Sequence, residues 1–222
     1  MRKFFEIGGL IAAAVLIGFG IVAIVMGVNG RSTVNTSLSN EYIVGSPDMT
    51  PSAIRAEAQK AGIVSAVKQW PTENIANQKI DTGDEARQMS MYMHIHSLEA
   101  TGGYTYAQMG QFTAKPGTPK SELMPGGGTS NSEFAVVDPK TEQPLPNGAR
   151  NVWVTYNALG TALNTSFMAS QLALFGVVVG IALLLTGIGF AILAIGGALR
   201  NPQTALGFLR RTDPKTPAVP VT

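Results

Sequence analysis

The stretch that decides the fold is Ile7–Val28, "IGGLIAAAVLIGFGIVAIVMGV", which contains no charged side chain. As an α-helix it would rise about 33 Å at ~1.5 Å per residue, enough to cross the ~30 Å hydrocarbon core of a bilayer. A second stretch, Leu172–Leu199, "LALFGVVVGIALLLTGIGFAILAIGGAL", is longer and also carries no charge. Its length exceeds the hydrocarbon core, so this helix must tilt or emerge from the bilayer. The two stretches predict two transmembrane helices.

Basic residues beside these stretches predict how the chain is oriented in the cell membrane. Arg2 and Lys3 precede the first stretch, and basic residues also follow the second, so the positive-inside rule places both termini in the cytoplasm. The first stretch is longer than the apolar region of a secretory signal and lacks a closing cleavage site, so we expect it to remain as an anchor. The predicted layout is a cytoplasmic N-terminus (1–6), a first span (7–28), an extracytoplasmic domain (29–171), a second span (172–199) and a cytoplasmic basic tail (200–222).

Local signals predict that the extracytoplasmic domain is mostly helical. Thr82 and Glu85 match a capping box, in which each side chain bonds the backbone of the other residue, and Gly102-Gly103 is a helix stop. These signals predict a helix over residues 83–101. Helices are also predicted near residues 51–61 and 150–171. In the last, larger side chains such as Leu159 and Leu163 recur at helical spacing, so this helix should pack on the domain and run unbroken into the second span. The β-branched "VWVT" leaves a strand as the alternative for its first five residues.

Other parts of this domain are less regular or leave alternatives open. Residues Asn29–Asn40 fit either a helical stalk or coil. Lys115–Gly148 is rich in Pro, Gly, Ser and Thr, which is typical of loops. A small hairpin with its turn at Asp138-Pro139 is one alternative within that loop. The predicted fold class is therefore a mainly α membrane protein, with two transmembrane helices flanking a mostly helical extracytoplasmic domain that carries a Pro/Gly-rich loop.

Small residues recur about every seven positions in both predicted spans. Seven residues is close to two helical turns, so each set forms a stripe on one face, and such stripes let helix backbones approach closely in lipid. The spans can pair within one chain or between chains; we favour the antiparallel pair within one chain. The residues of the two stripes are Gly9, Ala13, Gly20 and Gly27 in the first span, and Ala173, Gly176, Gly180, Gly187 and Ala194 in the second.

The stretch Met89–His96, "MSMYMHIH", holds both histidines of the chain and is a candidate metal site. Soft thioethers beside imidazoles are ligands that copper prefers. On the predicted helix, Met89, Met93 and His96 share one face, whereas His94 and His96 diverge by ~200°. A metal site on this helix could therefore use only Met89, Met93 and His96, and it would need further ligands from other parts of the chain. The favoured interpretation is that this face packs in the core, and no cofactor is predicted.

Composition and motifs exclude several function classes. The chain has no cysteine, which removes disulfides, thiolate catalysis and cysteine-type metal sites. The hydrolase elbow, the zinc-protease motif and the phosphate-binding loop are absent from the sequence. A formal net charge of +2 predicts no nucleic-acid partner. Neither predicted span contains an ionisable residue, which argues against a transporter or proton pump.

Two further segments are His96–Gly110, "HSLEATGGYTYAQMG", and Asn147–Ala169, "NGARNVWVTYNALGTALNTSFMA". In these segments the chain resembles a group of uncharacterised two-span membrane proteins from actinobacteria. The resemblance extends through "VGSPDMTPSAI" and implies two spans with an extracytoplasmic domain, not a mechanism. Some members of the group carry the name aromatic ring-opening dioxygenase. That activity needs iron ligands, typically two histidines and a carboxylate, in a soluble fold, and His94 and His96 on one helix do not supply this set.

The sequence thus leads us to expect a non-enzymatic integral membrane protein. The leading expectation is an accessory subunit or envelope scaffold that contacts the lipid bilayer and binds a protein partner, or a second copy, through its outside domain. The alternative is an extracytoplasmic module that binds a metal or a small ligand for sensing or delivery.

Overall fold

The computed structural model describes the backbone of residues 2–196 and the side chains of residues 4–196. These residues form helices without a regular β-strand, and they divide into two compact units, residues 2–29 with 173–196 and residues 30–172. The prediction of a mainly helical protein is confirmed; the predicted basic tail (200–222) lies outside the described residues. The α-helices are α1 (Arg2–Asn40), α2 (Pro51–Lys60), α3 (Gly83–Ala100) and α4 (Gly148–Ile195), and the short 3-10 turns are η1 (Tyr106–Gln108), η2 (Lys120–Glu122) and η3 (Ser132–Phe134).

Two of these helices, α1 and α4, are long and apolar enough to cross a membrane, as predicted. The most apolar 18-residue window of each has a mean hydropathy of 2.7. Helix α1 continues beyond Val28 through the polar residues Asn29–Asn40, so the stalk alternative holds and the coil alternative does not. Helix α4 joins the helix predicted near residues 150–171 and the second apolar stretch into one element of 48 residues.

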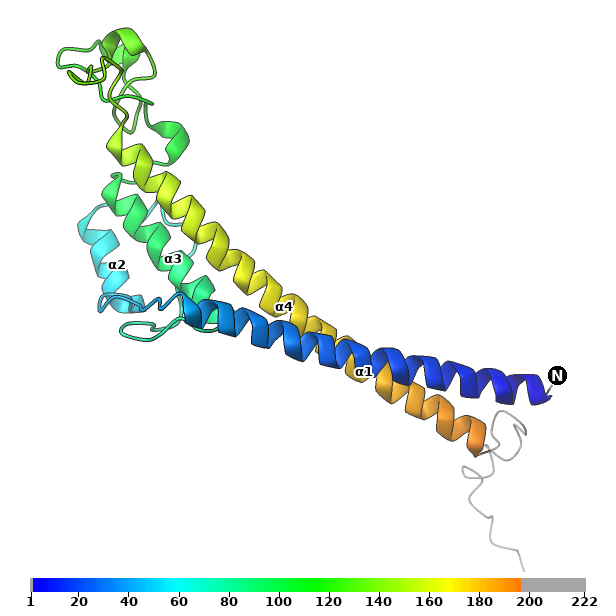
Figure 1. The fold of residues 1–222 in the computed structure, drawn as a ribbon. Helices are drawn as coiled ribbons and strands as arrows, with labels where there is room; N and C mark the ends of the chain where they lie inside the picture. Colours follow the sequence, from blue (N-terminus) through cyan, green and yellow to red (C-terminus); the bar gives the residue numbers. More distant parts are fainter. Residues whose placement is uncertain (1, 197–222) are drawn as a thin grey trace, which may run out of the picture. The chain divides into compact units, whose positions relative to one another are not determined.

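Within the first unit, α1 and α4 form an antiparallel pair (Figure 1). A Cβ atom built on Gly20 would lie 2.8 Å from the carbonyl oxygen of Gly180, and one built on Gly27 would lie 2.5 Å from that of Ala173. A Cβ on Gly187 would lie 3.0 Å from the carbonyl oxygen of Ala13. The residue numbers of the contacts therefore increase along α4 as they decrease along α1, as in an antiparallel pair. At the contacting glycines the two backbones are too close for a residue larger than glycine.

The two stripes of small residues occupy this interface. Gly9, Ala13, Gly20 and Gly27 are the buried residues of the described segment 4–29, and Gly180, Gly187 and Ala194 are those of 173–196. Ala173 and Gly176 are half-buried. The structure thus brings the predicted stripes together within one chain. The opposite faces of both helices expose large apolar side chains, among them Phe19, Met26, Phe175, Leu185 and Ile192, and such a surface is compatible with lipid.

The second unit is built around α3, whose start matches the predicted capping box. The Thr82 hydroxyl accepts from the Glu85 N–H, and the Glu85 carboxylate accepts from the Thr82 N–H at 3.0 Å. Helix α2 begins similarly, because the Thr50 hydroxyl accepts from the Ala53 N–H. The two helices pack through an apolar core that contains Ile54, Ala58, Ile75, Ile80, Ile95 and Leu98.

A seam of polar and aromatic side chains joins α3 to the first half of α4. The Asn164 amide donates to the Ser90 hydroxyl at 2.9 Å, and Gly160 approaches the same serine. Farther along, the Trp153 indole N–H donates to the Tyr104 carbonyl at 2.7 Å. These directed hydrogen bonds fix the position of α4 against α3 and against the turn that follows α3, because each buried polar group needs its own partner.

The Pro/Gly-rich segment Lys115–Gly148 and the residues 104–114 before it are held by single bridges and turns. Phe112 pairs with Thr129 and with Pro146, and Val137 pairs with Pro144, each in antiparallel fashion. The chain reverses between Asp138 and Gln143, so the proposed turn exists, yet no regular hairpin strands form in the described residues.

The close approach at Gly20 gives a direct stability test. We expect Gly20→Leu to destabilise the helix pair by about 1–3 kcal/mol, because the larger side chain meets the backbone of α4. Gly18→Leu is the matched control, since nothing lies within 4 Å of a Cβ at that position. The unfolding midpoint in mild detergent, followed by circular dichroism, measures the difference; equal midpoints for the two variants would contradict the close packing.

Candidate cation centre and apolar cavity

The two histidines of α3 face different neighbours, as the helical spacing predicts. The His94 ring lies against two aromatic rings of α4, 5.5 Å from the centroid of Trp153 and 5.1 Å from that of Tyr156. Burial lowers the pKa of His94, so the neutral imidazole is favoured in this aromatic surrounding. His94 is therefore a packing residue of the seam.

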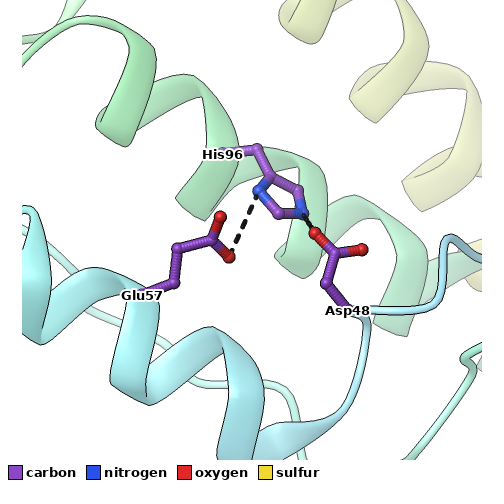
Figure 2. A group of neighbouring side chains, drawn as sticks. All are labelled: Asp48, Glu57 and His96. Carbon is purple, nitrogen blue, oxygen red and sulfur yellow. Dashed lines mark ion pairs between the residues drawn. The ribbon is translucent and has the colours of Figure 1, made fainter.

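His96 instead lies among three carboxylates. Its Nε2 atom is 3.5 Å from Asp48 Oδ2, and its Nδ1 atom is 3.8 Å from Glu57 Oε2 and 3.9 Å from Glu99 Oε2. Figure 2 shows Asp48 and Glu57 on opposite sides of the imidazole. Among the described residues, Asp48, Glu57 and His96 form a group whose ligand atoms all lie within 4.8 Å of one another. We call His96 and the three carboxylates the His96 cluster.

Three separate segments position the His96 cluster. Asp48 lies in the loop before α2, where a turn bonds the Met49 N–H to the Ser46 carbonyl at 3.0 Å. Glu57 lies in the middle of α2, and Glu99 is one turn after His96 on α3. The apolar packing of α2 on α3 therefore brings the four side chains together.

The electrostatics of the cluster distinguish its carboxylates. The Ser46 hydroxyl donates to Asp48 Oδ1 and, as the largest cause, lowers the pKa of Asp48. Burial, followed by the hydrogen bond and charge of Glu99, raises the pKa of Glu57. The cluster is only partly buried, since His96 is 28% exposed and Asp48 is 44% exposed, so it is open to ions from solvent.

The predicted face of Met89, Met93 and His96 does not form one ligand set. Met89 and Met93 pack against the core and line a cavity, whereas His96 contacts the carboxylates. The sequence pattern indicates His96 as a candidate ligand but does not indicate its carboxylate partners. Asp48 and Glu57 lie far earlier in the chain than His96. The amphipathic pattern of the helix that carries Glu57 is the local signal that could have pointed to that residue.

The cavity beside the two methionines has a volume of about 430 Å³. It lies between the end of α1, α3 and α4, and all of its lining residues belong to the second unit. A volume of this size is within the range of small-molecule sites. Six of the residues lining it are Ser37, Leu38, Met89, Met93, Leu159 and Leu163.

The raised pKa of Glu57 predicts a pH-dependent stability effect. The folded protein holds the Glu57 proton more tightly than the unfolded chain, so this group lowers stability as pH rises above its unfolded value of about 4.5. With a chelator present, Glu57→Gln should stabilise the protein at pH 8 by a few tenths of a kcal/mol, about the size of a like-charge repulsion. The gain should vanish at pH 4, as measured by thermal unfolding; a gain that persists at pH 4 would contradict this origin.

Comparisons with protein-family models, with curated proteins and with solved structures give no match to this chain. The resemblance of residues 96–110 and 147–169 to actinobacterial two-span proteins therefore stays a prediction.

Proposed function

We propose that the chain is a two-pass protein of the cell membrane, with residues 29–171 outside the cell and both termini in the cytoplasm. In this proposal it is a non-enzymatic accessory subunit or envelope scaffold that binds a protein partner through the outside domain. The two long apolar helices and the basic residues flanking them in the sequence support this topology.

The helix pair favours anchoring over transport. The small-residue faces of α1 and α4 are used against each other, and the faces that remain exposed carry apolar side chains suited to lipid. The apolar segments contain no ionisable residue of the kind that marks ion or substrate pathways. Function is therefore assigned to the outside domain.

The observation that carries the partner proposal is an exposed, uncharged face on the first half of α4. The chain has no charged residue from Asn151 to Leu199, although much of α4 before Leu172 is exposed. Exposed helix faces of monomeric proteins usually carry charge, whereas interfaces are depleted of it. The exposed residues of this face, at helical spacing, are Asn151, Val154, Ala158, Thr161, Thr165 and Met168.

The composition of this face indicates the kind of partner. Ala158, Thr161 and Thr165 are small, so they allow a second helix to approach closely, and Val154 and Met168 offer apolar area at 53% and 64% exposure. The face runs toward the span along one continuous helix. A membrane protein that presents an uncharged helix outside the bilayer fits these properties.

A charge placed on this face should disrupt the complex. Full-length tagged protein, purified in mild detergent from its native host, is expected to retain a stoichiometric partner, and Thr161→Lys or Thr165→Lys should reduce the retained amount about tenfold or more, because a buried unpaired charge is costly. Ser130→Lys, on an exposed position of the Pro/Gly-rich segment, is the control.

The protein fractions are quantified by mass spectrometry of the eluate. A wild-type protein that elutes alone, or Lys variants that keep the partner, would overturn the proposal. If the only protein recovered with the tagged chain is a second copy of the same chain, the face mediates self-association and the proposal of a different partner protein is wrong.

The cavity supports a second candidate function, the binding of a small apolar ligand. Its lining is mainly apolar, and methionines such as Met89 and Met93 adapt to flexible chains. Glu41 is the charged residue among those that line it, so an anionic head group is not favoured. An alkyl chain with a neutral head fits this lining.

Photolabelling tests the cavity. In nanodiscs, a long-chain alcohol with a diazirine in its alkyl chain should label Met89, Met93 or Leu163. Ala162→Phe, at a lining position, should reduce this labelling severalfold, whereas Ala158→Phe, one turn earlier and not part of the lining, should not. Equal labelling of both variants, or labelling only outside the cavity, would exclude the ligand site.

A further inference from the structure

We propose that the His96 cluster is a binding site for one divalent transition-metal ion, with Zn²⁺ as the representative ion. In this site His96 Nδ1, Glu57 and Glu99 are the ligands, and Asp48 orients the imidazole from the other side. The inference is independent of the partner proposal.

The first argument is geometric. Glu57 and Glu99 lie on the same side of the ring, 3.8 and 3.9 Å from Nδ1. These separations are longer than a hydrogen bond, which reaches about 3.2 Å. Ligands of a tetrahedral zinc ion, each ~2.1 Å from the metal, lie about 3.4 Å apart. Each carboxylate oxygen is therefore within about half an ångström of the separation from Nδ1 that a shared ion requires.

The second argument is the arrangement on the opposite ring nitrogen. A histidine that binds a metal usually directs its other nitrogen at a carboxylate, which fixes the ring orientation and raises its basicity. Asp48 lies on this side of the ring, with its Oδ2 atom 3.5 Å from Nε2, and a movement of about 0.3 Å would bring it within hydrogen-bond distance. Its second oxygen is held by the Ser46 hydroxyl, so the carboxylate is itself oriented. Such a chain from hydroxyl to carboxylate to imidazole is typical of metal sites.

The third argument is charge. Three carboxylates surround one imidazole, and the ion pairs in the described part of the chain are all contacts of these carboxylates with His96. A divalent ion bound between these groups would neutralise the excess negative charge.

The ligand set also indicates the class of metal. One imidazole nitrogen with carboxylate oxygens suits Zn²⁺ or a neighbouring transition ion, because Mg²⁺ and Ca²⁺ prefer oxygen ligands alone. Copper(I) prefers thioethers, and the two methionines of this face line the cavity. The partial exposure of the cluster leaves room for water as a fourth ligand and for entry of the ion.

Metal analysis of the full-length protein tests the site. Protein purified in mild detergent, stripped with a chelator and reloaded with Zn²⁺, should bind one ion per chain after desalting and should melt several degrees higher. His96→Ala and Glu57→Gln should abolish the bound ion and the shift, and Glu99→Gln should weaken binding strongly. Asp48→Asn should weaken binding about 10- to 100-fold without abolishing it, as expected for a residue that orients a ligand.

Two controls separate metal binding from misfolding. His94→Gln and Glu133→Gln change the same residue types outside the cluster and should keep one ion per chain. Co²⁺ loading of the wild-type protein needs no variant and should give the visible absorption of a four-coordinate site. A wild-type protein that takes up no ion, or a His96→Ala variant that binds as the wild type does, would overturn the proposal.

Discussion

The contact between the backbones of α1 and α4 at Gly20 and Gly180 is the constraint on which the rest of the structure depends. At this point neither helix can carry a side chain larger than hydrogen, so the pair has one register and one facing side. The same register places Gly27 beside Ala173. The chain leaves the helix pair just after Gly27 and returns to it at Ala173. The second unit, residues 30–172, therefore begins and ends at neighbouring points, which lowers the entropy cost of forming its internal contacts.

The second unit is held together by two different kinds of interaction. Its helices are joined by apolar packing between α2 and α3, and by directed polar bonds between α3 and α4, such as the Asn164–Ser90 bond. Apolar burial has no preferred direction, whereas a buried hydrogen bond requires its partner in place. The candidate sites lie where this packing leaves groups accessible: the His96 cluster between α2 and α3, and the cavity where the end of α1 meets α3 and α4.

The sequence predicts those features whose causes are local. The capping box at Thr82 and Glu85, the divergence of His94 and His96, and the two apolar stretches depend on residues within a few turns of each other. The partners of His96 could not be predicted, because they depend on how α2 packs on α3, which no periodic pattern encodes. Helical spacing assigns Leu159 to the packed face of α4, yet this residue is 50% exposed and lines the cavity instead.

The positions of the two tryptophans give the protein a selective optical reporter. Trp153 lies in the seam beside His94, and Trp70 lies under the Arg55 guanidinium at 4.7 Å. Both belong to the second unit, and the chain has no other tryptophan. Intrinsic tryptophan fluorescence therefore reports on the second unit, while the helix pair contributes no emission of this kind, so melting of the second unit can be followed by itself without any label.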